Sequence, residues 1–210
     1  MVMVRTVKDP ETRRQEIVST ACQLFQSKSY KHTSMNDVMD ALGIAKGTIY
    51  HYFKSKEDLL EAVIESIVAD DLIQKRLLLT QTPGNALDKL RVLITSTNLA
   101  TEYGFVLEDL RQTDNVGMHT GLVATAFARQ SPLYAELIQQ GCAEGLFHTA
   151  YPLECAEFIL AAVLFLTDVV IYPWATADLQ RRVLALPTLV ETQLKAPAGS
   201  FAFLSQFLIL

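Results

Sequence analysis

The stretch TSMNDVMDALGIAKGTIYHYF, residues 33–53, decides the fold that this sequence predicts. Ser34 followed by Asp37 is the capping-box pattern that starts a helix, and Gly43 is suited to ending that helix. From Ala45 the chain has room for a second short helix. Two short helices around a tight glycine turn form a helix-turn-helix, which is compact enough to present its second helix to the major groove of DNA.

Helices are also expected on both sides of this stretch. Asp9 and Pro10 are a cap and a first helical residue, and apolar side chains then recur at helical spacing to about residue 28. Ser55 and Asp58 form another capping box, from which a long helix continues to about residue 79. Further helical segments, separated by glycine and proline, are expected at about 85–101, 105–113, 119–129, 132–144, 153–172 and 177–195. No stretch alternates as a strand does, so the chain is predicted to be all-α, with about nine helices.

Charge is divided unevenly along the chain. All 210 residues together carry a formal net charge of −5, which by itself disfavours a nucleic-acid partner. Residues 1–60 nevertheless hold nine Lys and Arg against seven Asp and Glu, whereas residues 61–210 hold nine against sixteen. Only the N-terminal part is therefore suited to phosphate. Half of all residues are apolar, which favours a subunit interface or an internal pocket in the rest of the chain.

Polar groups gather on the second helix of the helix-turn-helix. At its start, Lys46, Gly47 and Thr48 offer a long cation, a bare backbone and a hydroxyl to base edges and phosphates. Other candidates follow in the same helix or stand at the starts of two neighbouring helices, where backbone N–H groups favour phosphate oxygens. The candidate DNA-binding residues are Thr33, Ser34, Lys46, Gly47, Thr48, Tyr50, His51, Tyr52 and Lys56.

These residues also carry a resemblance to a known family. It rests on Ile17, Ala21, Leu24 and Phe25, on the segment from Thr33 to Gly43, on KGTIYHYF at 46–53 and on KSKEDLL at 54–60. In that order they resemble the DNA-binding head of the TetR (tetracycline repressor-like) family over residues 11–71. The sequence departs from the family at Ala45, where members often carry a serine that caps the recognition helix.

The resemblance implies roles for single residues. Lys46, Gly47 and Thr48 would read or flank bases. Phosphates would be held by Thr33, Tyr50, Tyr52 and Lys56, with His51 beside them, while Ile49 and Phe53 would be structural. It also implies a helix-turn-helix domain over 11–71 with its motif at about 34–53 and a helical ligand-binding and dimerisation domain over 72–200, and the sequence leaves an apolar tail over 201–210. The tail either packs on the body or frays.

The last two long helices are the expected dimer interface. Residues 158–166 are apolar on every side, which fits burial against a partner chain or burial in the subunit's own core. The resemblance favours the partner chain, because the last two helices of this family pair with their copies in a four-helix bundle. The candidate interface residues are Phe158, Leu160, Leu164, Phe165, Leu179 and Val183.

Polar residues scattered among the apolar body helices are candidates for an effector pocket, although each alone also fits a solvated surface. An apolar, acidic body favours a lipophilic molecule that is neutral or cationic. The histidines match no compact zinc pattern with Cys142, so no metal is expected. The candidate pocket residues are Glu102, Tyr103, Glu108, His119, Tyr134 and His148.

Other functional classes are disfavoured. The sequence has no nucleophile motif and no glycine-rich phosphate loop, so we expect neither an enzyme nor a cofactor other than an unidentified effector. Three widely spaced cysteines predict no disulfide framework and favour the cytoplasm, and we expect no signal peptide or membrane span. The predicted function is a homodimeric repressor that a small molecule releases from a palindromic DNA operator. A TetR-like activator and a ligand-binding helical dimer that no longer reads DNA stay open.

Overall fold

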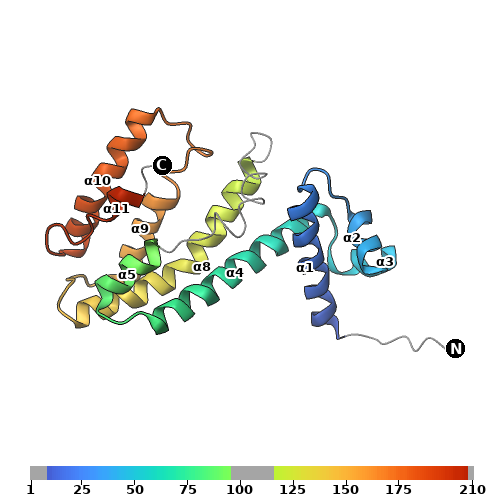
Figure 1. Cartoon of the computed structure of the whole chain (residues 1–210), viewed down its shortest axis with the longest axis horizontal. Coiled ribbons are helices and arrows are strands. Elements are labelled where there is room, and N and C mark those ends of the chain that lie inside the picture. Colours follow the sequence, from blue (N-terminus) through green and yellow to red (C-terminus); the bar gives the residue numbers. More distant parts are fainter. Residues whose placement is uncertain (1–8, 96–115, 208–210) are drawn as a thin grey trace. The chain divides into compact units, whose positions relative to one another are not determined.

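The structure is a computed structural model that describes residues 9–95 and 116–207. Within these ranges every regular element is a helix (Figure 1). The described residues divide into two compact units, the first ending at Ile67 and the second beginning at Val68. The helices are α1 (Pro10–Lys28), α2 (Met35–Leu42), α3 (Lys46–Tyr52), α4 (Lys56–Gln81), α5 (Ala86–Thr95), α8 (Val116–Ala143), α9 (Pro152–Leu164), α10 (Thr176–Leu194) and α11 (Leu204–Phe207).

The first unit contains α1, α2, α3 and the start of α4, and its helix ends are formed by local hydrogen bonds. The predicted capping box at Ser34 and Asp37 is present in both directions. Gly43 ends α2 in the left-handed conformation with φ of 61°, and its N–H donates to the carbonyl of Asp40. Ile49 and Phe53 are fully buried, so one side of α3 is anchored in the core of this unit.

The second unit packs around α8, which contacts α5 and α9, while α10 contacts α9 and α11 (Figure 1). The apolar tail joins this core. Phe201, Phe203 and Leu204 are buried, and the ring of Phe201 packs against Phe147. Of the two outcomes left open for the tail, its described part therefore packs on the body.

Two expected helix boundaries are wrong. A break was expected at Ser131-Pro132, yet α8 continues through Pro132 to Ala143. Pro132 removes one backbone donor, but buried Leu133, Leu137 and Ile138 keep the following turns against the core. The helix expected over 153–172 ends at Leu164, and residues beyond it form turns. The segment expected at 105–113 lies outside the described residues.

Candidate nucleic-acid interface

Helix α3 has one buried and one open side. Ile49 is buried, whereas Lys46, Gly47 and His51 are exposed and Tyr50 keeps 41% of its surface exposed. Thr48 and Tyr52 are half-buried. The structure thus brings the six predicted DNA-binding residues of this helix to the open side of a short, anchored helix. Because Ala45 provides no side-chain cap, α3 begins with backbone hydrogen bonds alone, as expected where the family's serine is missing.

Aromatic rings hold two of the cations. The Lys46 Nζ lies 5.7 Å from the centre of the Tyr50 ring, and the Lys56 Nζ lies 4.0 Å from the centre of the Tyr30 ring. The half-buried position of Lys56 lowers the pKa of its ammonium. Burial, together with the nearby Glu57 carboxylate, raises the pKa of Tyr30 to about 12, so its hydroxyl stays protonated and donates to Glu57. Lys56 is therefore oriented before any ligand arrives.

The start of α2 is tied to the end of α1. The Nζ of Lys28 lies 2.8 Å from Oδ1 of Asp37, whose other oxygen accepts hydrogen bonds from Ser34. The Lys28 ammonium, followed by the hydrogen bonds from Ser34, holds the pKa of Asp37 well below its usual range. Ser34 is exposed at this helix start. Its hydroxyl bonds to Asp37, so a phosphate would meet a pre-ordered helix end.

Thr33 corrects the prediction for this region. Its side chain is only 2% exposed, and its hydroxyl bonds to the carbonyls of Ser29 (2.8 Å) and Leu24 (3.3 Å). A buried hydroxyl with partners inside the protein cannot hold a phosphate. Thr33 instead fixes the connection between α1 and α2. Two exposed cations that the sequence analysis did not name, Lys31 and Lys54, flank the motif. Their charge is the only signal in the sequence that could have pointed to them as phosphate contacts.

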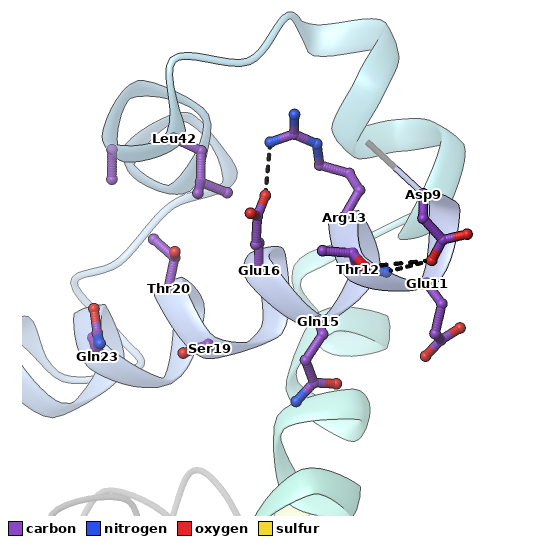
Figure 2. Close-up of a pocket in the computed structure, with 11 residues that line it drawn as sticks. Asp9, Glu11, Thr12, Arg13, Gln15, Glu16, Ser19, Thr20, Gln23 and Leu42 are labelled. Atoms are coloured by element: carbon purple, nitrogen blue, oxygen red, sulfur yellow. Dashed lines mark hydrogen bonds and ion pairs between the residues drawn. The ribbon is translucent and has the colours of Figure 1, made fainter. Parts of the chain in front are cut away.

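A shallow hollow of about 740 Å³ lies along α1 and is lined also by Ala41 and Leu42 of α2 (Figure 2). Its charged lining residues are three carboxylates, Asp9, Glu11 and Glu16, and one guanidinium, Arg13. Arg13 Nη1 lies 2.9 Å from Glu16 Oε2, and Asp9 accepts from the N–H of Thr12 (Figure 2). Three carboxylates against one guanidinium leave the lining net acidic, so the hollow is not suited to binding an anion.

Two of the predicted effector-pocket residues that the structure describes, His119 and Tyr134, do not lie side by side. His119 is buried and hydrogen-bonded to Asp168, and Tyr134 is buried in the core, where burial raises the pKa of its hydroxyl further above the usual range. His119 and Tyr134 are separated by about 22 Å along α8, at a rise of about 1.5 Å per residue. His148 is exposed in a surface connection, where its backbone N–H donates to the carbonyl of Leu194, and its place in a pocket stays a prediction. Glu102, Tyr103 and Glu108 lie outside the described residues.

The predicted interface residues separate into two groups. Phe158 on α9 is 72% exposed, and Leu164, Phe165 and Leu179 are partly exposed. Leu160 and Val183 are buried within their own subunit, so they are core residues and the interface prediction is wrong for them. On a segment that is apolar on every side, helical periodicity cannot distinguish core residues from interface residues. The sequence reading missed other large apolar side chains exposed on or next to α9 and α10, namely Tyr151, Leu153, Leu166, Val169, Tyr172, Leu184 and Leu189.

Comparison with known proteins decides the family. The model of "Bacterial regulatory proteins, tetR family" matches residues 17–63, and that of "Tetracyclin repressor-like, C-terminal domain" matches residues 101–189. This chain belongs to the tetR family. The tetR-family assignment makes the protein a helix-turn-helix transcriptional regulator that binds DNA, and not an enzyme. None of its described helices is both long and apolar enough to cross a membrane.

Individual relatives agree with the tetR-family assignment. The HTH-type transcriptional repressor KstR2 of Mycolicibacterium smegmatis is 29% identical over 153 residues, which cover 68% of this chain and 71% of the relative. KstR2 of Mycobacterium tuberculosis is 24% identical over 149 residues, covering 69% of this chain and 74% of that protein. A crystal structure of a TetR-family regulator from Pectobacterium atrosepticum matches with a TM-score of 0.68 and 26% identity, covering 92% of this chain and all of the other.

Proposed function

We propose that this tetR-family regulator is a homodimeric repressor, which binds a palindromic operator and leaves it when a small molecule binds in the second unit. Its domains would be a DNA-binding head over 11–71 and a body over 72–200. One observation carries the DNA-binding part of the proposal: Ile49 and Phe53 anchor α3 in the core, while Lys46, Tyr50 and His51 stay exposed. The residues that would contact DNA are Ser34, Lys46, Gly47, Thr48, Tyr50, His51, Tyr52 and Lys56.

The assignment as a repressor is supported by the curated relatives, since the KstR2 proteins are named as transcriptional repressors. A cytoplasmic protein bound to the chromosome would fit this role. Two heads related by a two-fold axis would reach successive major grooves of a palindrome when their half-sites lie about 34–36 Å apart. An effector that favours another head spacing by ~3 kcal/mol would weaken operator binding by about two orders of magnitude.

Homodimer formation is supported by the exposed apolar side chains of the second unit. Phe158 on α9 and Leu184 and Leu189 on α10 are each more than 60% exposed. Large apolar patches on a soluble protein mark interaction surfaces, and a closed two-fold dimer would cover the same patch on both copies.

The dimer is tested by sedimentation of Phe158→Glu. We expect this variant to run as a monomer at concentrations where the wild type is dimeric, because a charge would be buried in the interface. Ile73→Glu on α4 is the matched control, since Ile73 is 61% exposed but lies outside α9 and α10. A dimeric Phe158→Glu variant, or a monomeric wild type, would contradict the proposed interface.

The DNA-binding function is tested by selection from random duplexes with the full-length protein. We expect enrichment of a palindrome whose half-sites are centred one helical turn apart, or a multiple of that distance. A reporter carrying that palindrome over its promoter should then be silenced when the protein is present. Enrichment of no palindrome would contradict operator binding, and stimulation of the reporter would identify an activator.

A further inference from the structure

A buried histidine of the second unit is held by a carboxylate from another element. His119 lies on α8 and is only 4% exposed, and its Nε2 is 2.6 Å from Oδ2 of Asp168, in the turns that follow α9. The other carboxylate oxygen of Asp168 accepts the backbone N–H groups of Val170 (2.8 Å) and Ile171 (2.9 Å). Both oxygens of Asp168 therefore have partners, and the imidazole ring is fixed in one orientation.

The second ring nitrogen of His119 has no such partner. Its Nδ1 is the one buried side-chain nitrogen or oxygen in the described part of the chain that lacks a hydrogen bond. The next buried residues along α8, which are Leu122, Val123 and Ala126, are all apolar. Buried polar atoms in folded proteins nearly always have a partner, so an orphaned nitrogen at an apolar position points to a ligand.

The hydrogen bonds of Asp168 decide what this nitrogen can bind. Both oxygens of Asp168 act as acceptors in this arrangement, Oδ1 for two backbone N–H groups and Oδ2 for the ring nitrogen. The ring therefore donates through Nε2, and in the tautomer that carries its single proton there, Nδ1 has a lone pair. A buried acceptor followed along its helix by apolar buried residues is complementary to a hydrogen-bond donor on an otherwise apolar molecule, because a charged ligand would lose its hydration on burial.

We propose that Nδ1 of His119 accepts a hydrogen bond from the hydroxyl group of the effector, an otherwise apolar alcohol or phenol. This proposal rests on the proposed function only in identifying the bound molecule as the effector. It defines a ligand class by chemistry, with His119 as the contact residue and Asp168 as the residue that positions its ring and fixes its tautomer.

The substitution Asp168→Asn separates this role from a merely structural one. The asparagine oxygen would still accept from Val170 and Ile171, while its amide group would face Nε2 of His119 and donate to it. The ring proton would then move to Nδ1, which becomes a donor. The preference of the site should change from hydroxyl groups to carbonyl groups, which packing alone would not cause. His119→Phe should remove the preference in both directions.

The experiment measures binding of simple probes to the full-length protein by NMR titration, without DNA. Cyclohexanol and phenol are compared with methylcyclohexane and toluene, and cyclohexanone is the acceptor probe. For the wild type we expect the hydroxylated probes to bind roughly three- to tenfold more tightly than the hydrocarbons, the ratio that one net hydrogen bond supplies. For Asp168→Asn we expect cyclohexanone to bind more tightly than cyclohexanol.

Several outcomes would overturn the proposal. Equal affinities for alcohol and hydrocarbon, absence of binding by every probe, or an unchanged preference in Asp168→Asn would each do so. A nitrogen chemical shift showing Nδ1 already hydrogen-bonded in the ligand-free protein would do the same. Hydroxyl-selective binding that leaves operator affinity unchanged would instead contradict release by the effector and leave the site intact, so the two failures are distinguishable.

Discussion

The ammonium of Lys56 lies 4.0 Å from the centre of the Tyr30 ring, and the hydroxyl of Tyr30 donates to Glu57, the next residue of α4. The start of α4 is thereby joined to the connection that precedes α2. The ring orders a lysine that would otherwise sample many rotamers, and losing that freedom in advance lowers the entropic cost of holding a phosphate.

Substitution of Lys56 by alanine should weaken binding to every duplex by a similar factor. A phosphate contact carries no sequence information, so the ratio of operator to random-DNA affinity should stay nearly constant. The slope of log K against log salt concentration should become shallower by about one. Gel-shift titrations at several salt concentrations measure both quantities. Arg129→Ala on α8 removes the same charge from the second unit and should leave the slope unchanged.

Substitution of Gly47 by alanine should stabilise the fold and weaken DNA binding. A methyl group at Gly47 meets nothing within 4 Å, and its backbone is helical, where alanine is favoured over glycine by up to about 1 kcal/mol. If the bare backbone of α3 approaches the bases, the same methyl group should reduce the affinity for the operator by roughly tenfold. Gel shift measures the operator affinity, and thermal unfolding measures the stability of the same variant. Gly43→Ala is the contrasting variant, since its φ of +61° should cost about 1–2 kcal/mol of stability. Unchanged operator affinity in Gly47→Ala would remove Gly47 from the interface.

Stability of the first unit should depend on the ionisation of Asp37. The Lys28 ammonium and the Ser34 hydrogen bonds lower the pKa of Asp37 in the folded state. Because the pKa is lower in the folded state, the ionised Asp37 stabilises the fold at pH values above its unfolded-state pKa of 3.8. This stabilisation is lost as the pH falls below 3.8 towards the folded-state pKa. Asp37→Asn should therefore be less stable than the wild type near neutral pH, and the difference should shrink in acid.

Urea unfolding of both proteins between about pH 7 and about pH 3 measures this difference. Asp40→Asn removes an exposed carboxylate from the same helix and is the matched control. A difference between wild type and Asp37→Asn that stays constant across the whole range would show that Asp37 acts through its shape and not through its charge.

The first unit was predictable because its signals are local. Ser34, Asp37 and Gly43 set helix ends through hydrogen bonds to neighbouring residues, so the bounds of α2 follow from the sequence alone. The burial of Thr33 did not follow, since its two acceptors belong to the end of α1 and the turn after it. A threonine at a helix start fits both a phosphate contact and an internal linker, and only tertiary packing decides between them.

The second unit was less predictable because its segments are apolar on all sides. Periodicity could not separate Phe158, which is exposed, from Leu160, which is buried. Pro132 is a strong break signal, but packing of the flanking turns outweighs its missing N–H. The pairing of His119 with Asp168 joins residues 49 positions apart, a separation at which the sequence pattern carries no information.

The tail makes the last prediction, because its described part belongs to the core. Phe201 is 2% exposed between Phe147 and Phe203, with ring centres 5.9 and 5.8 Å away, and its N–H donates to Glu191 of α10. Phe201→Ala should therefore cost about 3–5 kcal/mol in urea unfolding at fixed protein concentration. Ala202→Ser changes the exposed neighbour and should stay within about 0.5 kcal/mol of the wild type. If Phe201→Ala were as stable as Ala202→Ser, the tail would have to be undocked in solution, because partial relaxation of a packed core does not recover the full cost of removing a buried phenyl ring.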